Sequence, residues 1–501
     1  MDSLASMLCL LLALTSTLIY IAKTIKRRRT NLPPGPQALP LIGNLHQLGL
    51  KPHKSLSKLA ETYGPIMTLK LGQVTTIIIS NASVAKQVLQ KQDQAFANRS
   101  IPDSILACDH NKLSVAWIPL SPKWRELRRI CYSHIFSSQK MEAFELTRHH
   151  KVHELIAQLG RSAASGEAVL FGDKIFKTLL NLLSSIFVSC DIVAESESDV
   201  GKEFRESFRS IMELAGKPNF VDYFTWLKRV DPQRIRAQMT PHFAKMLSFS
   251  DSIIGQRLRQ REENGSVFES IDVMDALINI MQDSSSPELT RNDINHLFVD
   301  LFVAGTDTTS STLEWALSEV MKHPDTILKA KVELDQAIGK GNQVEDKDIL
   351  RLPYLQAIVK ETLRLHPPFP LLLPRKNFKE EELLNYTIPK DSQVMINAWA
   401  IGRDPSLWEC PNDFKPERFL DSEVDVKGGH FELIPFGAGR RICAGLPLAH
   451  KMIHLVLGSV INCFDWKLQG GAKPEEELNM EEEFGLSLQR VQPLRVIPVA
   501  V

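Results

Sequence analysis

The sequence predicts a mainly helical protein with small β-sheets, attached to a membrane by one N-terminal segment. Three observations support this prediction. The chain begins with a long apolar run, a single helical pattern starts near Thr290, and strand-like runs such as Thr75–Ser80 are few and short. The helical pattern covers about 30 residues, or roughly 45 Å, which is enough to cross a whole domain. We therefore expect one large helical domain behind an anchor.

The composition is that of a globular protein with a sizeable core. Of 501 residues, 44% are hydrophobic and 24% are charged, and 59 Lys and Arg balance 59 Asp and Glu. This balance argues against nucleic acid as a partner, because nucleic-acid-binding proteins usually carry a basic surplus. The 7 cysteines include no CxxC pair, which argues against a disulfide framework or a zinc ribbon. We expect most of them to be small buried side chains.

The N-terminal apolar run predicts a transmembrane anchor over residues 1–23. No charged residue lies between Leu4 and Ala22, a stretch of roughly 28 Å as a helix, which is close to the thickness of a bilayer. A cleaved signal peptide is the alternative, but here the basic residues follow the apolar run. Residues 24–36 contain that basic cluster and then the stiff, proline-rich Leu32–Pro36 hinge. The positive-inside rule places the cluster, and the domain of residues 37–501, in the cytosol.

The longest predicted helix carries a polar interruption. Thr290 and Asp293 form a capping-box variant at its start, and the pattern stops before Pro324. At its centre, Ala304–Thr309 places a glycine, an acid and hydroxyls between apolar flanks. Glycine costs about 1 kcal/mol there relative to alanine, and threonine can bend a helix by bonding to the preceding turn. The residues alone leave two interpretations: a solvated patch, or a kinked polar spot for a small ligand and a proton relay.

A second predicted helix, Tyr354–Leu365, carries a charged pair. It ends before a Pro-Pro pair, because the residue before proline is disfavoured in the α conformation. Glu361 and Arg364 are three residues apart and face the same side, and Glu361 falls on the apolar stripe. This spacing predicts a partly buried pair, which needs further partners for both charges. Arg418 is a candidate partner.

The segment Pro435–Gly445 is the most informative stretch. Its glycines permit tight turns and close backbone approach to a flat ligand. Cys443 lies beside two arginines and before a helix predicted over Leu446–Gly458, and both settings favour the thiolate, the form that binds metal. From the residues alone Cys443 could equally be a hydrolase nucleophile, with His430 or His450 as its base. A zinc site is disfavoured, because no second cysteine or paired histidine is close.

Motifs along the whole chain resemble those of the cytochrome P450 family. Phe436, Gly439, Arg441, Cys443 and Gly445 match its F-x-x-G-x-R-x-C-x-G signature. Its other landmarks follow in the family's order: the proline hinge at Pro33–Pro36, W-x-x-x-R at Trp124 and Arg128, A-G-x-D-T-T at Ala304–Thr309, E-x-x-R at Glu361 and Arg364, and P-E-R-F at Pro416–Phe419. The resemblance implies the fold of that family, with the long central helix lying over haem b.

The resemblance also implies a role for each matched residue. Cys443 would be the axial thiolate of the haem iron, whose electron donation favours O–O cleavage. Asp307 and Thr308 would deliver protons during oxygen activation. The network supporting the cysteine loop would be Glu361, Arg364 and Arg418. The residues expected to bind haem are Trp124, Arg128, Arg375, Phe436 and Arg441, with the guanidinium groups on the propionates.

The reaction partners also follow from the resemblance. A haem monooxygenase would use O2 and take electrons from NADPH through a separate membrane-bound reductase, since this chain has no flavin or nicotinamide domain. The expected location is the endoplasmic reticulum membrane, crossed once, with the catalytic domain in the cytosol. Rival interpretations are an O2-independent haem isomerase or dehydratase, a non-catalytic haem sensor, and a cysteine hydrolase. Asp307 and Thr308 speak against the first of these.

Several stretches, including NLPPGPQALPLIGNLHQLG from Asn31, are most similar to the plant microsomal group that includes geraniol hydroxylases. The positions that resemble its substrate-recognition segments are apolar: Phe302, Val303, Ala304, Phe369, Leu371, Leu372, Phe484 and Leu486. None carries a charge that would bind an amine or a zwitterion. We therefore expect a terpenoid substrate, a monoterpenol such as geraniol or an iridoid or diterpene, in preference to an aromatic alkaloid precursor or phenol.

Overall fold

The computed structural model describes residues 31–501, apart from 194–198, 265–271, 284–288 and 471–472. The expected anchor over residues 1–23 and the basic cluster after it lie outside the described residues. Within the described residues the fold is mainly helical, with one five-stranded sheet and three smaller sheets. The predicted fold class, mainly α with small β-sheets, is therefore confirmed.

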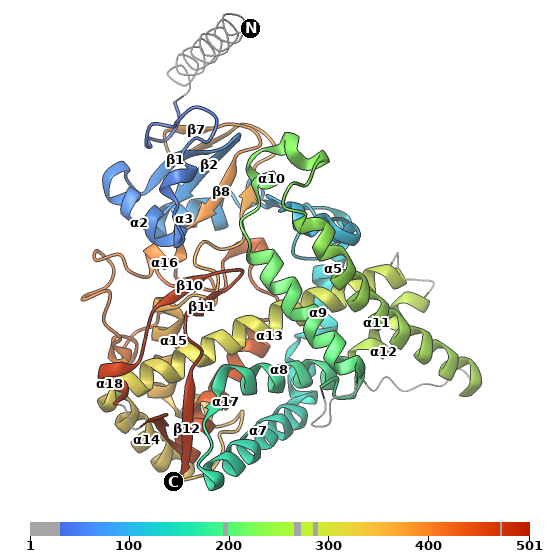
Figure 1. The fold of residues 1–501 in the computed structure, drawn as a ribbon, viewed down its shortest axis with the longest axis vertical. Helices are drawn as coiled ribbons and strands as arrows, with labels where there is room; N and C mark the ends of the chain where they lie inside the picture. Colours follow the sequence, from blue (N-terminus) through green and yellow to red (C-terminus); the bar gives the residue numbers. More distant parts are fainter. Residues whose placement is uncertain (1–30, 194–198, 265–271, 284–288, 471–472) are drawn as a thin grey trace, which may run out of the picture.

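The longest described helix, α13 (Arg291–Lys322), crosses the middle of the molecule (Figure 1). Thr290 and Asp293 form the predicted capping box at its start. The helix is continuous through its polar centre, where the Thr308 hydroxyl donates to the Ala304 carbonyl at 2.7 Å. The polar residues therefore interrupt the apolar pattern without ending the helix.

Helices from distant parts of the chain pack against α13, among them α8 (Phe171–Val188), α11 (Ile235–Asn264), α15 (Pro353–Leu365) and α17 (Leu446–Cys463). The predicted helix over Tyr354–Leu365 corresponds to α15 within one residue. Within the described residues, α17 is long and apolar enough to cross a membrane, but 67% of it is buried in the fold. We assign it to the core.

The five-stranded sheet has the order β1 (Ile66–Leu71), β2 (Val74–Ile79), β8 (Gln393–Ile396), β5 (Arg375–Lys376) and β3 (Asn98–Arg99). β1 and β2 form an antiparallel hairpin, whereas β2 and β8 are parallel. At the far edge β3 pairs with β5, and Arg99 lies directly opposite Arg375. This edge brings two cations together.

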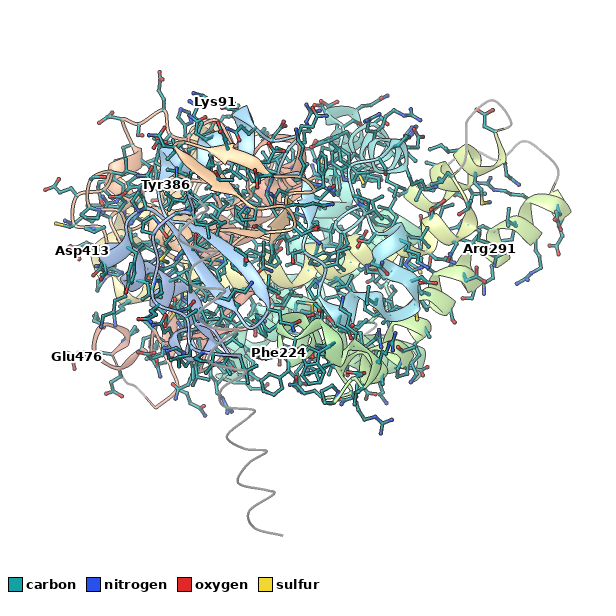
Figure 2. All side chains as sticks on the ribbon, turned by 90° about the horizontal axis from the view of Figure 1, so that it is seen from above. Lys91, Phe224, Arg291, Tyr386, Asp413 and Glu476 are labelled. Atoms are coloured by element: carbon teal, nitrogen blue, oxygen red, sulfur yellow. The ribbon has the colours of Figure 1, made fainter. Side chains whose placement is uncertain are left out.

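The smaller sheets are β4 (Val169–Leu170) with β12 (Arg495–Ala500) and β9 (Phe464–Leu468), β6 (Glu381–Leu383) with β7 (Tyr386–Ile388), and β10 (Glu482–Phe484) with β11 (Leu488–Arg490). The remaining helices are α2 (Pro52–Tyr63), α3 (Ala82–Lys86), α4 (His110–Leu113), α5 (Pro122–Ile130), α6 (Ser138–Ala143), α7 (Glu145–Ser165), α9 (Asp199–Gly216), α10 (Phe220–Tyr223), α12 (Val273–Gln282), α14 (Pro324–Ile338), α16 (Ala398–Ile401) and α18 (Pro474–Glu477). Figure 2 shows the side chains that fill the space between these elements, with Arg291 at the start of α13 and Asp413 on the opposite flank.

Candidate functional site

The loop before α17 holds Cys443 in a tight turn. The Cys443 amide donates to the Phe436 carbonyl at 3.0 Å, which closes the loop. Gly439 has a φ of +68°, and a Cβ atom there would lie 1.8 Å from the carbonyl oxygen of Leu89. Only glycine combines this conformation with such a close approach. The glycine of the predicted signature is therefore required by the packing of the loop.

The Cys443 side chain is solvent-accessible although protein surrounds it on all sides. The surface that it exposes therefore faces an internal space. Burial raises the pKa of the Cys443 thiol, while backbone hydrogen bonds from Gly445 and Leu446 and the charge of Arg128 act to lower it. A ligand thiol loses its proton when it binds a metal, so this pKa is that of the metal-free side chain.

The two arginines beside Cys443 do not act on it as the sequence suggested. Arg440 forms an ion pair with Asp93 at 2.9 Å, and Arg441 donates to backbone carbonyls, including that of Ala97 at 2.9 Å. The expectation that these neighbours lower the thiol pKa is wrong, because adjacent positions in a turn direct their side chains apart. The cation that acts on the thiol is Arg128, which comes from another helix.

Neither candidate base of a cysteine hydrolase is bonded to Cys443 in the described structure. His430 lies 3.4 Å from the Asp425 carboxylate. The His450 ring packs on His454 with centroids 4.3 Å apart, and burial lowers the pKa of His450 to about 4. Because a nucleophilic cysteine needs a base within hydrogen-bond reach, the geometry argues against the hydrolase interpretation.

The centre of α13 supplies a second surface that faces inward. Ala304 is exposed and Val303 and Thr308 are partly exposed, although most of the helix on either side is buried. Since α13 packs against α17, which begins just after Cys443, we infer that both surfaces border one interior space. The polar centre of the helix is thus internal, which disfavours the solvated-patch interpretation.

Four guanidinium groups gather in this part of the fold. Burial and the charges of Arg375, Arg441 and Arg128 all act to lower the pKa of Arg99. Burial, Arg375 and Arg128 lower the pKa of Arg441 to about 9, and burial lowers that of Arg375 to about 10. The Asp93 carboxylate acts on Arg375 in the opposite direction, toward a higher pKa. Like charges placed opposite each other on strands are destabilising. An anion bound beside this cluster would offset the repulsion between the guanidinium groups.

Two buried donors in the same region have no hydrogen-bond partner in the described structure, the Trp124 indole Nε1 and the Arg128 Nε. An unpaired buried donor costs about 1–3 kcal/mol. The Trp124 ring lies under the Arg441 guanidinium, 4.6 Å from the ring centroid. Guanidinium forks and N–H donors of this kind suit carboxylates. With a thiol facing the interior beside them, these residues fit a haem with its two propionates.

Arg99 is a site residue that the sequence analysis missed. It donates to the carbonyl oxygens of Ala116 at 3.2 Å and Leu373 at 2.8 Å. No motif or spacing marks it in the sequence. It becomes visible only when β3 pairs with β5 and places it opposite Arg375.

Glu361, Arg364 and Arg418 meet in one buried network. Arg364 binds Glu361 through two hydrogen bonds, of 2.6 and 2.8 Å, and neither side chain is exposed. Arg418 adds a bond of 3.0 Å to Glu361, and the Lys415 amide adds one of 2.8 Å. Arg364 also donates to the carbonyls of Gly402, Pro411 and Asp413. The network therefore fastens α15 to the loop region of residues 402–418.

Asp307 and Thr308 are neighbours on α13, but their side chains have different partners. The Asp307 carboxylate accepts from the Ser487 hydroxyl and, at 3.0 Å, from Gln489 Nε2. Burial raises the pKa of Asp307, while these two donors act to lower it. Ser487 and Gln489 are further residues that the sequence analysis missed.

A cavity of about 1120 Å³ lies beside α13 and includes Asp307 in its lining, but not Cys443. Five of the predicted substrate residues line it, namely Phe369, Leu371, Leu372, Phe484 and Leu486. Val303 and Ala304 do not line it and lie at the inward-facing centre of α13. Phe302 is placed elsewhere: it is fully buried and stacks on Phe298 at 4.1 Å. Its side of the helix faces the core, so the structure does not support its assignment to the pocket.

Comparison with known proteins agrees with the motifs. A family model described as cytochrome P450 matches residues 33–494. The chain is 52% identical to geraniol 8-hydroxylase of Catharanthus roseus over 99% of both chains. It is 49% identical to 7-ethoxycoumarin O-deethylase of Helianthus tuberosus, over 97% of this chain and 98% of that one. It is 46% identical to drimenol monooxygenase of Persicaria hydropiper, over 100% and 98%. Because the family match runs from the proline hinge almost to the last strand, this chain belongs to the cytochrome P450 family.

Proposed function

We propose that this chain is a haem-dependent monooxygenase that hydroxylates a small apolar plant specialised metabolite, a terpenoid such as a monoterpenol. The observation that carries the proposal is the setting of Cys443, an inward-facing thiol near a cluster of buried cations with little compensating negative charge. Haem b, when bound, supplies the activation of O2.

The residues of the site would each act on the haem or on a proton. Cys443 would bind the iron, and the loop closed by Phe436 would hold the sulfur in place. Trp124, Arg128, Arg375 and Arg441, joined by Arg99, would bind the propionates. Thr308 and Asp307 would hold the protons that oxygen activation consumes. The network of Glu361, Arg364 and Arg418 would keep the surrounding loops in position.

The substrate class is supported by the names of two relatives and by the cavity. Geraniol and drimenol, which those names contain, are both terpenoid alcohols. The residues Phe369, Leu371, Leu372, Phe484 and Leu486 give the cavity an apolar wall, which suits such a molecule. The relative named 7-ethoxycoumarin O-deethylase makes an aromatic ether or phenol the second candidate.

The proposal includes a membrane anchor at residues 1–23, a basic and proline-rich hinge at 24–36 and a catalytic domain at 37–501. The domain would lie on the cytosolic face of the endoplasmic reticulum and receive electrons from NADPH through a separate reductase. Exposed apolar side chains support membrane contact: Leu39, Leu41, Ile42 and Leu50 near the hinge, and Phe220, Trp226 and Val230 around α10. α10 lies at the same end of the molecule as β1 and β2 (Figure 1), and the Gln73 amide donates to the Tyr223 carbonyl at 2.8 Å. Apolar patches of this kind mark interaction surfaces.

The test is turnover by the full chain with a P450 reductase, NADPH and O2 against a panel of geraniol, an iridoid, a diterpene, tyrosine and 7-ethoxycoumarin. We expect O2-dependent hydroxylation of a terpenoid. Conversion without O2 would indicate an isomerase, and haem binding without any turnover would indicate a sensor. For the anchor, we expect deletion of residues 1–23 to reduce the fraction of protein that stays in membranes after alkaline extraction.

A further inference from the structure

Asp307 is a buried carboxyl group that has no ion-pair partner among the residues that the structure describes. It is 7% exposed. The Ser487 hydroxyl donates to its Oδ2 atom, and Gln489 Nε2 donates to its Oδ1 atom at 3.0 Å. Burying a carboxylate without such donors is very unfavourable. The β10–β11 hairpin is therefore what stabilises the Asp307 carboxylate in this position.

The register of the hairpin explains why both donors face Asp307. β10 and β11 are antiparallel, with Phe484 opposite Leu488. Because side chains alternate along a strand, Ser487 and Gln489 point to one face and Leu488 points to the other. Gln489 Nε2 also lies 3.3 Å from the Ser487 Oγ atom. The two donors thus act as one unit.

Both strands of the hairpin are bonded to helices. On β11, the Leu488 carbonyl accepts from the Ser311 hydroxyl at 2.8 Å and from Trp315 Nε1 at 3.1 Å. On β10, Glu482 Oε1 lies 2.9 Å from His53 Nε2, on α2. The turn between the strands packs closely against α9, where a Cβ atom on Gly216 would lie 2.7 Å from the amide nitrogen of Leu486.

That turn borders the cavity. Phe484, Gly485 and Leu486 line the cavity, and so do Ser487 and Gln489. Leu486 is the chain neighbour of Ser487, so a shift of the turn at Leu486 moves the Ser487 hydroxyl as well. One short segment therefore contacts both the contents of the cavity and the Asp307 carboxylate.

We propose that Ser487 and Gln489 are positioning residues for Asp307, and that the hairpin couples occupancy of the cavity to proton supply at this carboxylate. This inference rests on the proposed function, which assigns proton delivery to Asp307. Both carboxylate oxygens accept hydrogen bonds from the hairpin, whereas the Thr308 hydroxyl donates to the Ala304 carbonyl. A molecule packed against Phe484 and Leu486 displaces the turn, weakens the Ser487 bond and frees one carboxylate oxygen.

The experiment compares Ser487→Ala with Ser487→Thr, which keeps the hydroxyl, and with Ser311→Ala. Ser311→Ala is the matched control, because it removes a hydroxyl that bonds the same hairpin without touching Asp307. The first readout is the infrared carbonyl band of protonated Asp307 as a function of pH, assigned by its absence in Asp307→Asn. The neighbouring titratable group is Glu314, which Arg490 and Asp173 also face, and the assignment separates its band. The second readout is peroxide formed by the haem-loaded protein with reductase and NADPH, without substrate and with geraniol.

We expect the Asp307 band of Ser487→Ala to persist to higher pH than in the unmodified protein, because a donor that lowers the pKa of Asp307 is gone. We expect substrate-free peroxide to rise about tenfold, the equivalent of one hydrogen bond to a charged group, and Ser487→Thr to restore both values. Geraniol should change the band in the unmodified protein but not in Ser487→Ala. Equal bands and equal peroxide in Ser487→Ala and Ser311→Ala would overturn the proposal. A protein that never turns over would refute the proposed function instead, and the pH dependence of the band would still decide whether Ser487 positions Asp307.

Discussion

The buried network of Glu361 offers a sharp test of how this fold supports its site. We consider Glu361→Gln, which preserves the size of the side chain and removes its charge. Glu361 accepts bonds of 2.6 and 2.8 Å from Arg364, 3.0 Å from Arg418 and 2.8 Å from the Lys415 amide. In the variant, the buried Arg364 and the partly exposed Arg418 lose their shared anion, and the new amide N–H groups face donors.

The size of the expected loss in free energy of unfolding follows from the burial of the network. The side chains of Glu361 and Arg364 are both 0% exposed, so solvent cannot replace the lost charge. Removing one partner of a buried ion pair costs about 3–5 kcal/mol, out of a typical total stability of about 5–15 kcal/mol. We therefore expect the free energy of unfolding to fall by about 3–5 kcal/mol, a large share of the total.

The measurement is the midpoint of urea denaturation, followed by circular dichroism and by haem absorbance. The control is Glu345→Gln, the same substitution in an exposed pair with Lys347, which should leave the midpoint unchanged because exposed pairs contribute little. If Glu361→Gln denatures at the same urea concentration as the unmodified protein, the network is not a support of the fold and the reasoning fails.

Three further predictions concern single residues. Arg99→Leu removes one of the guanidinium groups expected on the propionates, so haem transfer to apomyoglobin should be about tenfold faster, as for one lost charge-assisted bond; unchanged transfer would exclude Arg99 from haem binding. Gly439→Ala must tolerate a φ of +68° and a contact of 1.8 Å with the Leu89 carbonyl, so the fraction of purified protein that carries haem should fall sharply, and full loading would contradict the loop geometry. Burial raises the pKa of Asp222 from 3.8 to about 6. The native state therefore binds more protons than the unfolded state between these pH values, and stability falls as pH rises through this window. The urea midpoint of Asp222→Asn should lack this fall with pH, and a pH slope identical to that of the unmodified protein would refute the prediction.

The long central helix shows how much of the fold could be predicted from local sequence. Thr290 and Asp293 mark its start because a capping box is a contact between near neighbours. The E-x-x-R pair could be predicted for a similar reason, since residues three apart share a helix face. Arg418 needed the family resemblance, because its contact with Glu361 joins positions 57 residues apart.

The parts of the site that were missed depend on distant pairing. Arg99 becomes recognisable only through its position opposite Arg375, and Ser487 reaches Asp307 across 180 residues. The sequence analysis assigned Phe302 to the pocket. An apolar residue next to a polar centre gives the same sequence pattern whether its side chain faces a ligand or the core. Its stacking on Phe298 decides between the two. Local patterns give elements and motifs, whereas the direction of a side chain depends on tertiary packing.

The central claim is that Cys443 is the thiolate ligand of a haem iron. The most direct measurement is the absorbance spectrum of the reduced, carbon-monoxide-bound protein, purified with its haem, for the unmodified chain, Cys443→Ser and the exposed control Cys190→Ser. We predict the thiolate-type Soret band in the unmodified protein and in Cys190→Ser, and its loss in Cys443→Ser. A Soret band that survives in Cys443→Ser, or that is missing from the unmodified protein, would contradict the account.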